Sequence, residues 1–209
     1  AELSTPADGE AEIPALVGRR HCGREVCCAD DPDWRGSLET MKIAVVSDSH
    51  DHGDLLLRAV GLARDWGAQA VLHCGDVIGG NTLRRAMEVG LPMHVIHGNN
   101  LGDIPAMSRL AFESRGALFY HGAEATLELG QRRLFMIHYP HLARGMALTG
   151  DYDVVFCGHS HIAGIERITH VRGGHTWLVN PGTVAGFGEP RTFVLGDLAE
   201  LSFVVRTLE

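Results

Sequence analysis

The chain has 209 residues, of which 45% are hydrophobic and 21% charged, an ordinary balance for a globular protein with one sizeable core. No apolar run reaches the roughly 18 residues that a membrane span needs, and no charged and then apolar leader opens the chain, so we expect a cytoplasmic protein without a membrane partner. The net charge of −8 argues against a strong grip on nucleic acid, because such a grip neutralises phosphates with Lys and Arg.

Residues 1–40 differ from the rest of the chain. They hold four arginines and nine acidic residues, so they carry −5 of the net −8. Pro, Gly, Asp and Glu dominate this segment, and no periodic apolar pattern lasts more than a few positions. We expect residues 1–40 to form an acidic, mobile N-terminal extension and residues 41–209 to form the folded domain.

The five cysteines give no disulfide framework for a chain of this length. Two of them, Cys74 and Cys157, fall in apolar strand patterns. The other three lie in the extension near His21, at Cys22, Cys27 and Cys28. This group could bind zinc in principle, but its spacing fits none of the usual paired patterns, so a solvated tail is the favoured interpretation.

From residue 41 onward, apolar strand patterns alternate with amphipathic helical patterns. We expect strands at residues 43–47, 70–74 and 93–97, followed in turn by helices at residues 54–66, 81–89 and 104–114. Asp54 stands near the expected N-cap of the first helix. This alternation predicts a parallel sheet with right-handed crossovers.

The second half of the chain contains many strand patterns and little helix. We expect strands at residues 125–129, 134–138, 154–157, 162–169, 177–179, 192–195 and 202–207, with one helix at residues 141–148. These strands predict a second sheet that is antiparallel or mixed. The expected fold class is therefore α/β, with two sheets packed face to face and helices on the outside.

Polar side chains of the metal-ligand type follow five of the expected strands. They lie in the motifs Asp48-Ser49-His50, Gly75-Asp76, Gly98-Asn99-Asn100, His138 and Gly158-His159-Ser160-His161. The carboxyl ends of parallel strands meet at one edge of a sheet, where open α/β sheets bind ligands. Residues two apart in an extended chain point to the same side, so Asp48 and His50 can face one ion, as can His159 and His161.

This set of two Asp, one Asn and four His can hold two metal ions side by side. The carboxylate of Asp76 can bridge two cations, and Asn99 offers a neutral oxygen ligand. A glycine before a ligand lets the chain turn sharply past the strand. Oxygen and nitrogen ligands without thiolate favour Mn²⁺, Fe or Zn²⁺. Each motif alone is common in loops, but five in this order at strand ends indicate a metal site.

Six blocks of the sequence carry a family resemblance: Ser47-Asp48-Ser49-His50-Asp51-His52, Cys74-Gly75-Asp76, Gly98-Asn99-Asn100, Ile137-His138, Gly158-His159-Ser160-His161 and Asn180-Pro181-Gly182-Thr183. They resemble the blocks of the calcineurin-like metallophosphoesterases, and most nearly those of the small single-domain, YfcE-like phosphodiesterases. The resemblance covers about residues 41–208, and the order and the spacing of the blocks both agree.

The resemblance implies a four-layer α/β/β/α sandwich, which agrees with the two-sheet architecture expected above. It implies that one metal is held by Asp48, His50 and His161. It implies that the other is held by Asn99, His138 and His159, and that Asp76 bridges the two. Asp76, Asn99 and His138 would then act in catalysis through the metals and a bridging hydroxide. The Asn180 block would line the mouth of the site or shape its last loop, although a plain Pro-Gly turn fits the sequence equally well.

Two positions depart from the family pattern. Many larger members carry a His directly after the metal-binding Asn as a candidate general acid. Asn100 stands at this position and cannot donate a proton with a useful pKa. The block at His138 commonly reads His-Gly-His, but here bulky Tyr139 and Pro140 precede His141. We expect His141 at the surface, with contact to the substrate as the alternative.

The remaining histidines have weaker assignments. We expect His73 and His94 to be packed or partly exposed in strands. His52 is expected to be a loop residue, with contact to a substrate phosphate as the alternative. Asp51 or Asp103 would orient the rings of the ligand histidines.

The sequence therefore predicts a two-metal hydrolase of phosphate esters, foremost a phosphodiesterase, with a small phosphorylated substrate such as a nucleotide. Two divalent ions are the expected cofactors, with Mn²⁺ ahead of Ni²⁺, Zn²⁺, Fe and Mg²⁺. Two alternatives stay open: a phosphomonoesterase of the same fold, and a non-catalytic scaffold for partner proteins with a residual metal site, as in eukaryotic retromer. Competent residues at all seven ligand positions favour the enzyme. A homo-oligomer is compatible with the sequence.

Overall fold

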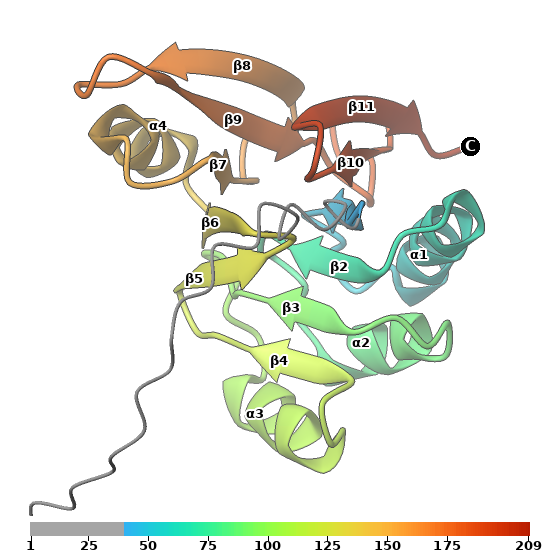
Figure 1. Ribbon diagram of the computed structural model, residues 1–209. Coiled ribbons are helices and arrows are strands. Elements are labelled where there is room, and N and C mark those ends of the chain that lie inside the picture. The colour runs from blue at the N-terminus through green and yellow to red at the C-terminus, as the bar shows by residue number, and fades with distance from the viewer. Residues whose placement is uncertain (1–39) are drawn as a thin grey trace, which may run out of the picture. The chain divides into compact units, whose positions relative to one another are not determined.

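The computed structural model describes residues 40–209, which form two β-sheets and four helices (Figure 1). The expected mobile extension and its zinc alternative lie outside the described residues. Within residues 40–209, no helix combines the length and the apolar character that crossing a membrane requires.

The first sheet has six strands in the order β11-β10-β1-β2-β3-β4. Its strands are β1 (Lys42–Val46), β2 (Ala70–His73), β3 (Met93–Val95), β4 (Leu118–Tyr120), β10 (Thr192–Asp197) and β11 (Ser202–Thr207). Strands β1 to β4 run parallel to one another, whereas β10 pairs antiparallel with both β1 and β11. In this register Ile43 of β1 lies opposite Ala70 on one side and Gly196 on the other.

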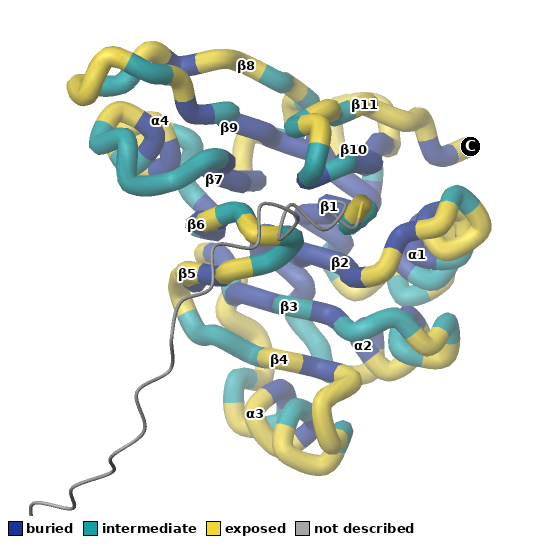
Figure 2. Tube along the Cα trace, viewed as in Figure 1, coloured by how far each residue is buried: buried dark blue, intermediate teal, exposed yellow. Residues whose placement is uncertain are grey.

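The second sheet has five strands in the order β5-β6-β7-β9-β8. Its strands are β5 (Glu124–Leu129), β6 (Arg132–Ile137), β7 (Val154–Phe156), β8 (Ala163–Thr169) and β9 (His175–Pro181). The three central strands are parallel, and β5 and β8 run antiparallel at the two edges. Figure 2 shows β1, β2 and β7 as buried, whereas β8 is largely exposed.

Helices cover the outer faces of both sheets and complete four layers. The helices are α1 (Gly53–Trp66), α2 (Gly80–Met87), α3 (Ile104–Glu113) and α4 (Pro140–Thr149). Alternate residues of β1 show how the layers form, because successive side chains of a strand point to opposite faces. Ala44 and Val46 join the core beneath α1, α2 and α3, and Ile43 and Val45 join the core between the sheets. A third cluster lies beneath α4. The expected α/β/β/α sandwich is confirmed.

Two local features differ from the sequence-based expectations. The hairpin of β10 and β11 joins the first sheet beside β1 and not the second sheet. The sequence did not predict this pairing, because a strand pattern does not identify the partner strand. Strand β4 is only three residues long and had no recognisable pattern. Asp54 lies near the N-cap of α1 as expected: the N-cap is His52, and Asp54 lies in the first turn, where its charge is favourable at the positive end of the helix dipole.

Candidate metal centre

Five strand ends from both sheets bring the seven expected ligand residues to one place. Asp48 and His50 follow β1, Asp76 follows β2 and Asn99 follows β3, all in the first sheet. His138 follows β6, and His159 and His161 follow β7, in the second sheet. The floor of the site is buried at Asp48, Asp76 and His138, and the mouth is exposed at Asn99 and His159.

The first cluster consists of Asp48, His50 and His161. Its ligand atoms all lie within 4.8 Å of one another. His161 Nε2 is 3.3 Å from Asp48 Oδ1, and His50 Nε2 is 3.8 Å from the same oxygen. The two Nε2 atoms are 3.4 Å apart. These three donors therefore converge as ligands of a single ion would.

The second cluster is centred on the amide oxygen of Asn99. Asn99 Oδ1 lies 2.8 Å from His159 Nδ1 and 3.2 Å from His138 Nε2. The rings of His138 and His159 meet edge to face, with centroids 5.2 Å apart. One oxygen and two nitrogen donors thus gather beside the first cluster.

Asp76 lies between the two clusters. Its Oδ2 is 3.9 Å from His50 Nε2, and its Oδ1 is 3.5 Å from His138 Nε2. Asp48, Asp76 and His138 also form a second compact group of potential ligands. A carboxylate in this place has one oxygen for each cluster.

The donor set fits the divalent ions that the arrangement implies. Asp48 is fully buried, and its Oδ1 has no hydrogen-bond partner among the described residues. Leaving a buried carboxylate oxygen unpaired is costly, and a cation at the first cluster would satisfy it. Oxygen and imidazole donors without sulfur match Mn²⁺, Fe or Zn²⁺.

The backbone at the site is left-handed, not extended as the sequence argument assumed. Five of the seven expected ligands have positive φ: Asp48 (52°), His50 (41°), Asp76 (53°), His159 (67°) and His161 (60°). Non-glycine residues rarely adopt this region, and such strain clusters at functional sites. Asp48 and His50 meet in the first cluster as expected, although their backbone is not extended, whereas His159 and His161 lie in different clusters and do not share one ion as expected.

Backbone carbonyls fix the orientation of two ligand histidines. His138 Nδ1 lies 2.7 Å from the carbonyl oxygen of Cys74, and His161 Nδ1 lies 2.9 Å from that of Phe187. Each Nδ1–H can donate to its carbonyl, which leaves Nε2 free to face the site. Burial lowers the pKa of His50 below its ordinary value, although Asp48 and Asp76 oppose this shift, so its ring favours the neutral form that binds metal.

The expected orienting role of Asp51 and Asp103 is wrong. Asp51 accepts a hydrogen bond from Thr82 Oγ1 at 3.1 Å, and Asp103 caps α3 through Ala106 N–H. Asp51 thus binds a side chain of α2 and Asp103 caps α3, and a motif search reveals neither contact.

The Asn180 block supports the site from behind. Asn180 Nδ2 donates to the carbonyl of Gly158 at 2.9 Å and to Ser160 Oγ at 3.0 Å. Buried Thr183 donates from Oγ1 to the carbonyl of Asp48 at 3.0 Å. The block therefore shapes two ligand loops, one after β7 and one after β1.

Asn100 has a role that its sequence position did not reveal. Its backbone N–H donates to Asp76 Oδ1 at 2.9 Å, and its Nδ2 donates to Asp76 Oδ2 at 2.6 Å. The residue in place of a candidate general acid thus holds the central carboxylate with two hydrogen bonds.

The other histidines belong to neither cluster. His73 is buried, as expected, between Ser49 Oγ and the Gly75 N–H, and burial lowers its pKa to about 3. His94 is half-buried and pairs with His121 at 3.0 Å. His141 is exposed, as expected.

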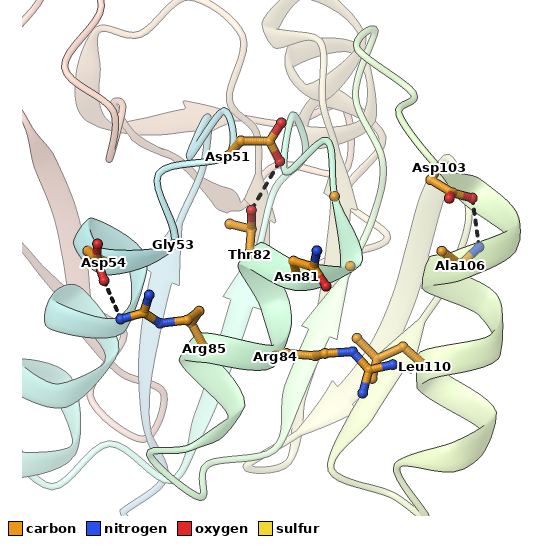
Figure 3. Close-up of a pocket in the computed structure, with 12 residues that line it drawn as sticks. Asp51, Gly53, Asp54, Asn81, Thr82, Arg84, Arg85, Asp103, Ala106 and Leu110 are labelled. Atoms are coloured by element: carbon orange, nitrogen blue, oxygen red, sulfur yellow. Dashed lines mark hydrogen bonds and ion pairs between the residues drawn. The ribbon is translucent and has the colours of Figure 1, made fainter.

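A cavity of about 680 Å³ lies outside the cluster of ligand residues, between the first turns of α1, α2 and α3. Figure 3 shows the hydrogen bond between Asp51 and Thr82 at one end of this cavity. It also shows Arg85 turned toward Asp54 and Arg84 turned toward Leu110. None of the seven expected ligands lines this cavity, so the converging donors, and not the cavity, define the candidate site.

Known proteins are similar to this chain in sequence and in fold. The calcineurin-like phosphoesterase superfamily domain matches residues 41–201. The chain is 26% identical over 149 residues to phosphodiesterase MJ0936 of Methanocaldococcus jannaschii, which covers 70% of this chain and 86% of that protein.

Solved structures extend the comparison of the fold. A structure of an archaeal phosphodiesterase matches with a TM-score of 0.72 and 23% identity, over 80% of this chain and 100% of that one. YfcE, a phosphoesterase from E. coli, matches with a TM-score of 0.56 and 21% identity, over 81% and 100%. Vacuolar protein sorting 29 of Cryptosporidium parvum matches with a TM-score of 0.51 and 15% identity, over 80% and 96%. Since the family domain spans most of the chain, this protein belongs to the calcineurin-like phosphoesterase superfamily, as a metal-dependent phosphoesterase.

Proposed function

We propose that the chain is a two-metal phosphodiesterase. The position of Asp76 carries this proposal, because its two oxygens approach one histidine from each donor cluster. One ion would be held by Asp48, His50 and His161. The other would be held by Asn99, His138 and His159, with Asp76 common to both.

Divalent ions at these donors supply Lewis acidity toward phosphate oxygens and lower the pKa of water. The chain's own residues hold the donors in place. Buried Asp48 and His138 anchor the floor, and the carbonyls of Cys74 and Phe187 orient two rings. We propose Mn²⁺ as the preferred ion, from the group of Mn²⁺, Fe and Zn²⁺ that oxygen and imidazole ligands without thiolate match.

The preference for diesters rests on the missing general acid. The side chain of Asn100 donates to Asp76 and has no proton of useful pKa to give. Protonation of the leaving group would then fall to water, and substrates with good leaving groups would suffer least. The name of the M. jannaschii relative, a phosphodiesterase, supports the same choice. A phosphomonoesterase of the same fold is the nearest alternative.

Metal add-back tests the proposal. Protein stripped by a chelator is assayed with bis(p-nitrophenyl) phosphate as the diester and p-nitrophenyl phosphate as the monoester, and Mn²⁺, Ni²⁺, Zn²⁺ and Mg²⁺ are returned in turn. We expect activity to vanish on stripping, to return best with Mn²⁺, and to favour the diester. Full turnover without any metal would refute the two-metal reading. Preference for the monoester would transfer the proposal to the alternative.

A further inference from the structure

An aromatic ring stands over the first donor cluster. Phe187 is 49% exposed, and its ring centroid lies 5.2 Å from that of His50 and 5.4 Å from that of His52. Two left-handed glycines flank it, Gly186 with φ 79° and Gly188 with φ 76°. The ring therefore presents apolar surface to solvent beside the ligand residues, where a planar group of a bound substrate could pack on it.

The loop that carries Phe187 is tied to the site. The N–H groups of Val184 and Ala185 donate to the carbonyls of Ser47 and Asp48 at 3.0 and 3.1 Å. The carbonyl of Phe187 accepts from His161 Nδ1. The ring is therefore held by the same backbone that positions the ligands, and a change of the Phe187 side chain leaves its carbonyl in place.

A second ring stands over the other donor cluster. The centroid of Tyr139 lies 5.5 Å from that of His138 and 5.1 Å from that of His159. Tyr139 is the N-cap of α4, which fixes the backbone from which the ring projects. The two donor clusters thus each have one aromatic ring from a different loop.

We propose that the substrate is a phosphodiester that carries a planar, unsaturated ring on each side of the phosphorus, with one ring packed on Phe187 and the other on Tyr139. This inference rests on the proposed function, since it places the phosphate between the two clusters. Aromatic rings pack on one another with a gain in affinity of roughly 2- to 10-fold beyond the burial of area. Aryl groups and nucleobases share this chemistry, and alkyl groups lack it.

Three probes with one leaving group separate these substituents. Each is a p-nitrophenyl phosphodiester whose second group is methyl, phenyl or thymidin-5′-yl. Hydrolysis adds water to phosphorus and breaks the bond to p-nitrophenolate, which leaves with the electron pair. Any intrinsic difference in reactivity cancels when the ratios of kcat/KM are compared between variants.

The variants are Phe187→Leu and Tyr139→Leu, which remove the ring and keep apolar volume. The matched control is Phe112→Leu, because Phe112 is 88% exposed on α3. We expect the variant facing the second group to lower the phenyl-to-methyl ratio by about 2- to 10-fold. The variant facing p-nitrophenyl lowers kcat/KM for all three probes. The control changes neither the phenyl-to-methyl ratio nor kcat/KM. A larger loss of kcat/KM with the thymidin-5′-yl probe than with the phenyl probe identifies the substrate ring as a nucleobase. A larger loss with the phenyl probe identifies it as an aryl group.

A binding measurement does not depend on turnover. Diphenylphosphinate carries two rings on phosphorus through bonds that cannot be hydrolysed, and dimethylphosphinate is its ring-free partner. Calorimetry on the Mn²⁺-loaded protein should give tighter binding of diphenylphosphinate, reduced in both ring variants at unchanged metal content.

The outcomes distinguish the two proposals. The ring inference is overturned if all three probes are hydrolysed, neither ring variant alters the ratios of kcat/KM between them, and the two phosphinates bind with equal affinity. This result leaves the phosphodiesterase standing. Ring-dependent phosphinate binding without hydrolysis of any diester overturns the phosphodiesterase and leaves standing only the packing of ligand rings on Phe187 and Tyr139.

Discussion

At the scale of single residues, Asn100 links the loop after β3 to the central carboxylate. Replacing it with Ala removes the 2.6 Å hydrogen bond from Nδ2 to Asp76 and leaves the backbone N–H bond. Partners that orient metal ligands typically contribute 10- to 100-fold in metal affinity or activity. We therefore expect Asn100→Ala to weaken Mn²⁺ binding by roughly 10-fold, measured by calorimetry.

The exposed Asn81 on α2 supplies the matched control, as Asn81→Ala. Asn100→His restores a donor and adds a group that can give a proton, so it should raise monoester turnover relative to Asn100→Ala. If Asn100→Ala binds Mn²⁺ as tightly as Asn81→Ala does, the hydrogen bond to Asp76 has no role in holding metal.

Residue types and their order predicted which side chains gather at the site, because ligand chemistry restricts them to Asp, Asn and His. The sequence could not reveal the supporting contacts. The carbonyl that orients His161 belongs to Phe187, and every residue has a carbonyl. The left-handed backbone at Asp48 and His159 has only a weak sequence signal, since Asp and His adopt positive φ more often than most residues but far less often than glycine.

At the scale of elements, glycines determine how closely the ligand loops approach. A Cβ at Gly158 would collide with Ser47 Oγ and lie 2.7 Å from Asp48 Oδ2. Both neighbours are buried, so they cannot move aside at low cost. We expect Gly158→Ala to destabilise the protein by about 1–3 kcal/mol in urea unfolding and to reduce metal binding by displacing Asp48.

Gly145 provides the opposite case. It lies within α4, and a Cβ there meets nothing within 4 Å. Gly145→Ala should stabilise the protein by about 0.5–1 kcal/mol, because alanine loses less backbone entropy in a helix. If the two substitutions changed the free energy of unfolding in urea equally, crowding would not be the reason for glycine at position 158.

Strands and helices with long apolar patterns were predictable, and short or partnered features were not. The continuous apolar run at β1 follows from burial of the strand on both faces, and this run is visible in the sequence. The three residues of β4 are too few for a period. The partner of β10 depends on which sheet edge is free, and this is a property of the assembled fold.

The face shared by β3 and β4 makes stability depend on pH. His94 pairs with His121 and stacks on Phe119 with ring centroids 4.7 Å apart. Burial, and then the neighbouring His121, lower the pKa of His94 from 6.5 to about 4. Between these values the unfolded chain binds more protons than the folded protein, so the free energy of unfolding falls as the pH falls from 6.5 toward 4.

His94→Gln removes this titrating group and keeps a hydrogen-bonding side chain. Urea unfolding from pH 7 to pH 4 should then show a slope shallower by up to about one proton. His175→Gln, at an exposed position, is the control. A slope that is identical in both variants and in the unaltered protein would contradict the neutral state of half-buried His94.

At the scale of the whole molecule, the candidate centre exists only where the two sheets meet. The first sheet contributes Asp48, Asp76 and Asn99, and the second contributes His138 and His159. The order of motifs along the chain therefore predicts the family, but their convergence requires the packed sandwich. Metal binding to such a site should also stabilise the folded state, since the unfolded chain does not hold the donors together.

The central claim is that two ions share Asp76. Asp76→Asn keeps the shape of the side chain and removes the charge that would offset two dications. The decisive measurement is the number of Mn²⁺ ions bound per chain, by elemental analysis after loading and desalting, together with turnover of bis(p-nitrophenyl) phosphate. We expect two ions in the unaltered protein, fewer in Asp76→Asn, and a loss of turnover of at least about 100-fold. An Asp76→Asn protein that keeps two ions and near-normal turnover would contradict the account.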